Sequence, residues 1–258
     1  MKGVILRFRD VCFSYHNLNG ETPALDHLSF DVKKGEFLAI VGPSGCGKST
    51  ILSLTAGLLV PEAGDITFFT ENPSDPKPGI GYMLQHDHLF EWRNIYRNLL
   101  LGLEINHKLT SERIRKVLAM ADDYGLTPFL KKRPSELSGG LKQRAALIRT
   151  MALEPDILLL DEPFSALDSQ TRLSVSADIC SIIRASGKTA ILITHDLAEA
   201  ISLADRILIL SNRPARVRNE FPVSLTLPDH SVLAARNAPE FQYYFNLLWE
   251  EMNDGKIQ

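Results

Sequence analysis

The chain has 258 residues, which is enough for one large domain or two small ones with an ample core. Hydrophobic residues make up 45% and charged residues 23%, as in ordinary globular proteins, and the formal net charge of −3 argues against broad binding to nucleic acid. No apolar run approaches the ~18 residues that span a bilayer. The apolar stretch near the N-terminus, Val4 to Leu6, is too short for a signal peptide. We therefore expect a protein that stays in the cytosol and reaches a membrane only through a partner.

The first predicted elements are strands. Val4–Phe8 and Leu28–Val32 partly alternate apolar with polar residues, which indicates antiparallel strands. Phe37–Val41 is a short apolar run typical of a buried strand, and Thr50–Leu54 has the composition of the first turns of a helix.

The segment between that strand and that helix carries the clearest motif. It matches G-x-x-x-x-G-K-S/T, a loop that wraps the phosphates of ATP or GTP. Glycines let successive backbone N–H groups point at an anion, and the helix start adds a partial positive charge. We expect Lys48 to reach the outer phosphates and Ser49 to bind Mg²⁺. An ordinary glycine turn is the alternative, but strand, loop and helix occur together. The expected nucleotide-binding residues here are Gly42, Pro43, Ser44, Gly45, Cys46, Gly47, Lys48, Ser49 and Thr50.

The middle of the chain, from about Arg93 to Leu153, is predicted to be mostly helical. Ser111 followed by Glu112 can open a helix. Two apolar stripes at helical spacing indicate core packing; they consist of Ile114, Val117, Leu118 and Ala121, and of Leu141, Ala145, Ile148 and Ala152.

Three later apolar runs predict strands buried on both faces of a parallel sheet, and hence an α/β core. They are Ile157–Leu160, Ala190–Ile193 and Ile207–Leu210. Asp161 and Glu162 follow the first run, at the sheet edge where ligands bind. Asp161 suits the outer sphere of Mg²⁺, and Glu162 can orient or deprotonate a water that attacks the γ-phosphate. The alternative is that they are strand-end carboxylates without a catalytic role.

A second motif, Leu137-Ser138-Gly139-Gly140 followed by Leu141, Lys142 and Gln143, resembles the signature of ATP-binding cassette (ABC) ATPases. The order of motifs is also similar to that family: phosphate loop, glutamine, signature, carboxylate strand, Ser165–Asp168 and histidine. The resemblance covers about Val4 to Val217. The fifth signature position departs from it, since Leu141 stands where glutamine is usual.

The resemblance implies a head-to-tail pair of cassettes that hydrolyses ATP with Mg²⁺. Ser138, Gly139 and Gly140 would close over the γ-phosphate bound by the opposite copy. It further implies roles for four residues. The plain alternatives are a surface amide for Gln85, a structural or merely exposed histidine for His195 and a strand tyrosine for Tyr15. Gln85 would contact Mg²⁺ and water, His195 the γ-phosphate, Asp168 the dimer interface and Tyr15 the adenine.

The expected fold is α/β, a P-loop NTPase (RecA-like) core with an N-terminal antiparallel β subdomain and an inserted α-helical subdomain. We expect an ABC ATPase domain over residues 1–220, with the helical subdomain at about 87–153. A C-terminal tail over residues 221–258 is expected to dock on the core through a helix that carries an aromatic cluster: Phe241, Tyr243, Tyr244, Phe245 and Trp249.

Weaker motifs resemble importers of the nitrate, sulfonate and taurine type. They are Leu89–Arg93, Asn98, Leu101–Leu103 and Ser211–Val217. Importers of pyrimidine vitamin precursors share these motifs, so the motifs do not decide the identity of the transported solute. The implied partners are a second copy, membrane permease subunits and an extracytoplasmic solute-binding protein, which would hold the chain at the cytoplasmic face of the membrane. Phe90 and Trp92 are either apolar anchors for the permease or core residues.

Other functions are less consistent with these motifs. A metabolic kinase with a phosphate loop has no use for Leu137–Gly140. A soluble cassette acting on nucleic acid or ribosomes usually carries two cassettes or strong basic patches. The three cysteines, Cys12, Cys46 and Cys180, show no metal-ligand spacing and are expected to be reduced and buried. Because Cys46 lies in the phosphate loop, its alkylation should block nucleotide binding.

Overall fold

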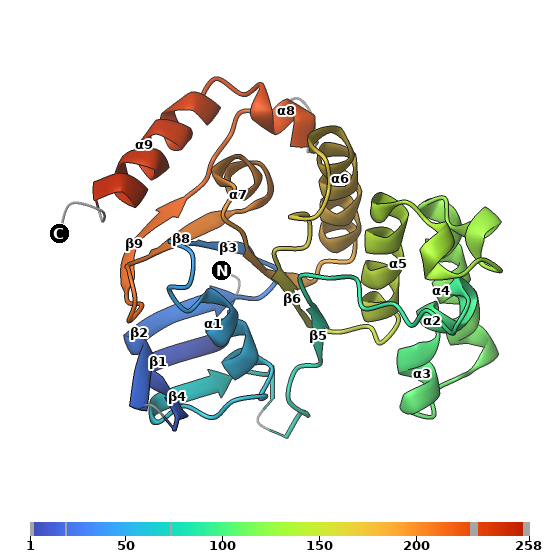
Figure 1. The fold of residues 1–258 in the computed structure, drawn as a ribbon, viewed down its shortest axis with the longest axis horizontal. Helices are drawn as coiled ribbons and strands as arrows, with labels where there is room; N and C mark the ends of the chain where they lie inside the picture. Colours follow the sequence, from blue (N-terminus) through green and yellow to red (C-terminus); the bar gives the residue numbers. More distant parts are fainter. Residues whose placement is uncertain (1–2, 19, 73, 228–231, 255–258) are drawn as a thin grey trace. The chain divides into compact units, whose positions relative to one another are not determined.

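The computed structural model describes residues 3–18, 20–72, 74–227 and 232–254 (Figure 1). The chain forms two compact units. The first unit comprises Met1–Pro78 and Gly187–Gln258, and the second comprises Gly79–Ser186.

The first unit begins with an antiparallel sheet in the strand order β2-β1-β4, formed by β1 (Val4–Asn17), β2 (Gly20–Lys33) and β4 (Ala63–Phe68). The predicted antiparallel pair is confirmed, but both strands are longer than expected, at 14 residues each. Several shifts of register between β1 and β2 let the hairpin continue past the regular alternation that the sequence shows. Phe8 and Phe30 stack across it with their ring centroids 4.7 Å apart.

A parallel arrangement follows in the same unit. β3 (Phe37–Val41) lies between β7 (Thr189–Ile193) and β8 (Arg206–Leu210) and is parallel to both, while β9 (Val217–Pro222) pairs antiparallel with β8. Every residue of β3 and β7 is buried, as the unbroken apolar runs predict. The helices that follow β3 and β7 are α1 (Lys48–Thr55) and α7 (Leu197–Leu203).

A largely buried ion pair ties the start of β3 to β8. Arg206 donates from Nε to Glu36 Oε1 at 2.8 Å, and the two side chains are 13% and 8% exposed. Arg206 also pairs with the more exposed Glu220 of β9 at 2.6 Å. One guanidinium therefore links three strands of this sheet.

The C-terminal helices α8 (Val232–Arg236) and α9 (Phe241–Asp254) both contact α7. On α9, Leu248 is fully buried, whereas Tyr243 and Trp249 are 65% and 56% exposed. The expected helix is present, but its aromatic cluster does not pack as a whole, because these two rings point to solvent.

The second unit contains a short parallel pair, β5 (Ile80–Met83) with β6 (Ile157–Asp161). Its helices include α2 (Ile95–Leu99), α3 (Leu101–Ile105), α4 (Ser111–Asp123), α5 (Gly139–Met151) and α6 (Ser169–Ala185), with 3-10 turns η1 (Thr127–Phe129) and η2 (Pro134–Glu136). Thr110, not Ser111, caps α4 and accepts a hydrogen bond from the Arg113 N–H.

The two predicted apolar stripes meet in one core cluster of the second unit. Val117 and Ala121 of α4 pack there with Ala145 and Ile148 of α5. The α-helical middle of the chain is thus confirmed. Among the residues that the structure describes, no helix is both long and apolar enough to cross a bilayer.

Candidate functional site: a phosphate-binding loop and its companion residues

The glycine-rich loop joins β3 to α1 in the first unit. Gly47 is the N-cap of α1 at φ 123°, and a Cβ there would lie 2.9 Å from the Ala24 carbonyl oxygen. Both the backbone angle and the close approach therefore require glycine. No described side chain caps α1. The N-terminal end of a helix carries a partial positive charge and suits an anion.

Lys48 is placed for phosphate binding by the loop itself. Its side chain is 6% exposed, and Nζ donates to the carbonyl oxygens of Gly42 and Pro43, both at 2.9 Å. An ammonium has three protons, so these two bonds leave a third donor for a phosphate oxygen. The Lys48 ammonium, the glycine-rich loop and the start of α1 together suit the phosphate groups of a nucleoside triphosphate.

Cys46 is a buried residue of the loop, and its Sγ would lie 3.1 Å from a Cβ placed on Gly42. It is 1% exposed, and burial raises the pKa of its thiol, opposed in part by the nearby Lys48 ammonium. Cys180 is buried as well, whereas Cys12 is only half-buried, so the expectation of three buried cysteines is wrong for Cys12. That residue sits at an irregular part of the β1–β2 hairpin, where register shifts open the strand pair.

Tyr15 lies next to the start of α1. Its hydroxyl is 3.0 Å from Oγ1 of Thr50, which is 5% exposed, while the tyrosine is 42% exposed. Phe13 packs edge-on against the ring at 5.0 Å between centroids. The ring is thus fixed by its hydroxyl and by one neighbour, with part of its surface open.

His195 follows β7, the strand next to β3. Because β3 and β7 are parallel and Ile40 pairs with Ile193, His195 and the phosphate loop leave the sheet at the same edge. The histidine is exposed, and Ser49 in the loop is exposed as well. The first unit therefore brings these two predicted residues to one side of the sheet.

A buried acid fixes the backbone around His195. Thr194 Oγ1 donates to Glu199 at 2.7 Å and accepts the Asp196 N–H at 3.0 Å. Asp196 in turn caps α7 by accepting the Ala198 N–H. Glu199 is 4% exposed, and sequence analysis missed it. The available signal was an acid inside the mostly apolar sequence of α7.

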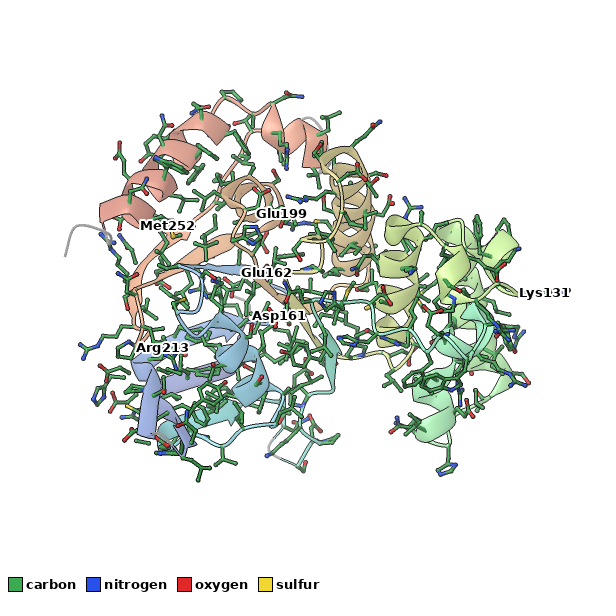
Figure 2. All side chains as sticks on the ribbon, in the orientation of Figure 1. Lys131, Asp161, Glu162, Glu199, Arg213 and Met252 are labelled. Carbon is green, nitrogen blue, oxygen red and sulfur yellow. The ribbon has the colours of Figure 1, made fainter. Side chains whose placement is uncertain are left out.

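In the second unit, Asp161 is the last residue of β6 and Glu162 follows it directly; both are labelled in Figure 2. Asp161 is 9% exposed, and the Tyr82 hydroxyl is 3.5 Å from its carboxylate. Glu162 has a left-handed backbone, φ 43°, which is uncommon for a non-glycine residue. Ser165 stabilises this turn, donating from N and Oγ to the Glu162 carbonyl oxygen at 3.2 and 3.0 Å. A strained residue directly after a buried strand is a pattern of functional sites.

Gln85 leaves the same edge of this strand pair. Met83 of β5 pairs with Leu160 of β6, so Gln85 and Asp161 both follow the carboxyl ends of parallel strands. Arg149, which sequence analysis also missed, holds the segment after Gln85 by donating to the Asp87 and His88 carbonyl oxygens, both at 2.7 Å. Burial lowers the pKa of Arg149, opposed by Asp87.

The signature segment begins α5. Ser138 is its N-cap and is exposed, and its hydroxyl makes no capping bond. A Cβ on Gly140 would lie 2.9 Å from Thr171 Cγ2, and one on Gly139 would lie 3.0 Å from Leu167 Cδ2. The glycines therefore let α5 approach the first turns of α6 and the residue Leu167 that precedes it. Asp168 caps α6 by accepting the Thr171 N–H at 3.0 Å.

The structure thus gathers the predicted residues in two sets. Tyr15, the phosphate loop and His195 belong to the first unit. The second unit contains Gln85, the signature, Asp161, Glu162 and Asp168.

Comparison with protein families identifies this arrangement. The family model described as "ABC transporter" matches residues 25–165, more than half of the chain. The chain belongs to the ABC transporter family. The expected fold is confirmed with it: an ABC ATPase cassette with a P-loop NTPase core, an N-terminal antiparallel β subdomain and inserted helices.

The similarity to individual relatives extends over nearly the whole cassette. The chain is 44% identical to the uncharacterised ABC transporter ATP-binding protein YtlC of Bacillus subtilis over 94% of both chains. It is 36% identical to the taurine import ATP-binding protein TauB of Roseobacter denitrificans over 92% of both chains. A dimeric post-hydrolysis structure of the ATP-binding cassette MJ0796 with ADP and Pi is similar with a TM-score of 0.70 at 28% identity, covering 85% of this chain and 99% of that one.

Proposed function

We propose that this cassette hydrolyses ATP to energise the import of a small solute, a nitrate-, sulfonate- or taurine-like anion, through a membrane permease. The observation that carries the proposal is the Lys48-containing cradle with His195 at the same sheet edge, in a chain similar to a taurine import protein over 92% of its length. A pyrimidine vitamin precursor is the alternative solute. A non-transport cassette is disfavoured by the net charge of −3.

In this proposal the loop residues Gly42–Thr50 bind the triphosphate. Their N–H groups and the Lys48 ammonium attract the phosphate oxygens, and the half-exposed Tyr15 ring stacks on the adenine. The proposed holders of Mg²⁺ are Ser49, Gln85 and Asp161. Ser49 and Gln85 would offer the oxygen ligands that this ion prefers, and Asp161 would act from the outer sphere. When bound, Mg²⁺ neutralises charge on the phosphate oxygens.

Glu162 is the proposed general base. Its carboxylate orients or deprotonates the attacking water, and the two Ser165 bonds to its backbone carbonyl oxygen stabilise the turn from which the side chain projects. His195 contacts the γ-phosphate, with its backbone fixed by the Thr194 network. Ser138, Gly139, Gly140 and Asp168 serve the partner copy in a head-to-tail dimer. The exposed, uncommitted Ser138 hydroxyl and the dimeric MJ0796 structure support this.

The loop after Gln85 is the proposed permease contact. Trp92 is 73% exposed and stacks on Phe90 at 4.5 Å between centroids, which excludes a core position for Trp92. A groove of about 490 Å³ adjoins it, lined by Trp92, Arg93, Tyr96, Arg97, Leu100, Glu104, Leu109 and Ile114. An apolar ring at the rim of a groove is suited to receive a short permease helix. This contact would hold the cassette at the cytoplasmic face of the membrane, with a solute-binding protein on the other side.

We further propose residues 1–220 as the ATPase domain, residues 87–153 as the permease-contacting helical subdomain and residues 221–258 as an accessory tail. The contact of α9 with α7 supports attachment of that tail to the core.

Glu162→Gln tests the catalytic part. The variant should bind ATP, lose nearly all turnover and form dimers in ATP that light scattering detects. Glu154→Gln is a matched control, because Glu154 has a similar left-handed backbone, φ 53°, at an exposed ion pair with Lys116. Undiminished turnover by the Glu162 variant, with no dimer, would refute the proposal.

The solute is tested on the reconstituted complex with its binding protein. Taurine, an alkanesulfonate or nitrate should stimulate ATP turnover, whereas a pyrimidine precursor should not. Stimulation of ATP turnover by the pyrimidine precursor alone would refute the anion as the solute and support the pyrimidine precursor instead.

A further inference from the structure

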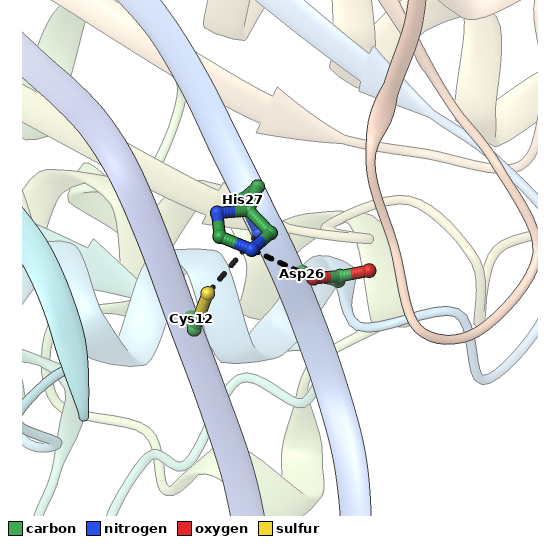
Figure 3. A group of neighbouring side chains, drawn as sticks. All are labelled: Cys12, Asp26 and His27. Carbon is green, nitrogen blue, oxygen red and sulfur yellow. Dashed lines mark hydrogen bonds and ion pairs between the residues drawn. The ribbon is translucent and has the colours of Figure 1, made fainter.

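A group of metal-binding side chain types lies in the β1–β2 hairpin, apart from the phosphate loop. Cys12, Asp26 and His27 each offer one donor atom, and the three atoms lie within 4.8 Å of one another (Figure 3). One is a thiol, one a carboxylate and one an imidazole, so the group is more than an acidic surface cluster.

An irregular stretch of the hairpin brings these residues together. The register between β1 and β2 shifts between Phe8 and Val11 and again between Val11 and Phe13. Within this stretch Asp10 and His27 both have left-handed backbones, with φ 54° and 50°. Such a bulge redirects side chains that a regular strand pair would hold apart.

Each candidate ligand is already oriented by a neighbour. His27 Nδ1 lies 2.7 Å from Asp10 Oδ1, and since a carboxylate only accepts, Nδ1 is the donor. That bond leaves Nε2 as the metal-facing nitrogen. Asp26 Oδ2 accepts Arg216 Nε at 2.8 Å, so Oδ1 faces His27 Nε2 at 3.7 Å. Cys12 Sγ accepts the His27 N–H at 3.3 Å.

We propose that Cys12, Asp26 and His27 bind a divalent cation of the Zn²⁺ type, with water in a fourth position. Zinc at its usual distances from nitrogen, oxygen and sulfur separates tetrahedral ligands by about 3.3 to 3.6 Å. The 3.7 Å between Asp26 Oδ1 and His27 Nε2 is close to this separation, and all three donor atoms lie within 4.8 Å of one another. A thiolate and a carboxylate supply two negative charges for the dication. The Asp10–His27 bond is the carboxylate–histidine contact that usually accompanies a zinc-bound imidazole.

The donor set selects the metal. Thiolate and imidazole ligands favour Zn²⁺ and Co²⁺ over Mg²⁺ and Ca²⁺, which prefer oxygen. The bound ion would join β1 to β2 across the bulge, a few residues before Tyr15 on the same strand. Its consequence for the protein is a metal-dependent stabilisation of this hairpin.

Co²⁺ titration of the purified full-length chain tests the site, because a cobalt–thiolate bond gives a charge-transfer absorption and tetrahedral cobalt gives intense d–d bands. We expect both, their displacement by Zn²⁺ at a ratio of one per chain, and a melting temperature that rises with free Zn²⁺. Cys12→Ala should remove the charge-transfer band. Asp10→Asn should keep it and weaken binding by about 10- to 100-fold.

Matched variants separate this site from adventitious binding. His27→Asn should abolish tight binding, whereas His107→Asn should not, although both histidines are exposed and have left-handed backbones. Asparagine tolerates that backbone, so both variants should fold. Cys180→Ala controls for cysteine. A wild-type chain without the charge-transfer band, or with zinc binding unchanged in Cys12→Ala and His27→Asn, would overturn the proposal.

Discussion

Replacing Asn98 by alanine should destabilise the second unit substantially. Asn98 is fully buried and holds the loop that carries Trp92. Its Oδ1 accepts the Phe90 N–H at 2.8 Å, and its Nδ2 donates to the carbonyl oxygens of Phe90, Arg93 and Asn94 at 3.1, 3.2 and 3.1 Å. Three carbonyl oxygens share two amide protons, so alanine removes about three hydrogen bonds in total. Each hydrogen bond contributes about 0.5–1.5 kcal/mol, and the partly buried Phe90 N–H loses its partner, so we expect the free energy of unfolding to fall by about 2–4 kcal/mol.

Urea unfolding followed by circular dichroism measures this loss, and hydrogen exchange of the Phe90 amide localises it. Asn106→Ala is the matched control. Its exposed amide makes one bond, to the Gly102 carbonyl oxygen at 2.8 Å, so its replacement should cost less than about 0.5 kcal/mol. A loss below about 1 kcal/mol for Asn98→Ala, with the Phe90 amide still protected, would refute the reasoning.

Three further outcomes are expected. In EDTA at pH 8, iodoacetamide should label Cys46 more slowly than Cys12, because burial raises the pKa of the Cys46 thiol and lowers its thiolate fraction. Mass spectrometry measures the labelling rate of Cys46, which should increase with pH. Complete labelling of Cys46 should block ATP binding, which an ATP titration measures. Glu36→Gln should lower the free energy of unfolding in urea by about 3 kcal/mol, because Arg206 then lacks its buried charged partner. Glu220→Gln should lower it by less than about 1 kcal/mol, since Glu220 is more exposed. Equal losses for the two variants would contradict this reasoning. Glu199→Ala should lower the kcat of ATP hydrolysis about tenfold, because the backbone around His195 loses the bond between Thr194 and Glu199. Glu199→Gln should retain most of the activity, since its amide oxygen can still accept that bond. Equal ATPase activity of the two variants would argue against this positioning role.

The parallel strands were predictable because burial on both faces imposes an unbroken apolar run. Phe37–Val41 matches β3 at both ends, and the other three runs differ from their strands by one residue at one end. The length of β1 and β2 was not predictable, because that hairpin continues through register shifts. Alternation of apolar and polar residues is lost wherever such a shift occurs, so the pattern ended too early.

The proposed site residues lie where a motif indicates them, as in the phosphate loop, the signature and the two carboxylates at the end of β6, Asp161 and Glu162. Glu199 and Arg149 were missed because their importance depends on burial and on backbone partners far along the chain. Arg149, for instance, binds the carbonyl oxygens of Asp87 and His88, about 60 residues away in sequence. No local spacing records such a contact.

Cys12 illustrates the same limit for metal ligands. Its 14- and 15-residue separations from Asp26 and His27 match no compact ligand motif, and only the bulge in the hairpin brings the donors together. Residue types suited to metal binding were visible, but their convergence was a property of the strand pairing.

Backbone strain by itself does not separate function from structure in this chain. The described non-glycine residues with positive φ are all Asp, His or Glu. Glu154 and Glu162 have nearly the same φ, 53° and 43°, yet Glu154 closes the end of α5, where its N–H binds the Met151 carbonyl oxygen. Glu162 instead follows a buried strand, beside the nearly buried Asp161. A turn at a helix end has a sufficient structural cause in the helix itself, whereas the turn at Glu162 places a second carboxylate at the sheet edge. The pair Glu154→Gln and Glu162→Gln therefore compares the same chemical change in the same backbone conformation, and only position can account for a difference in turnover.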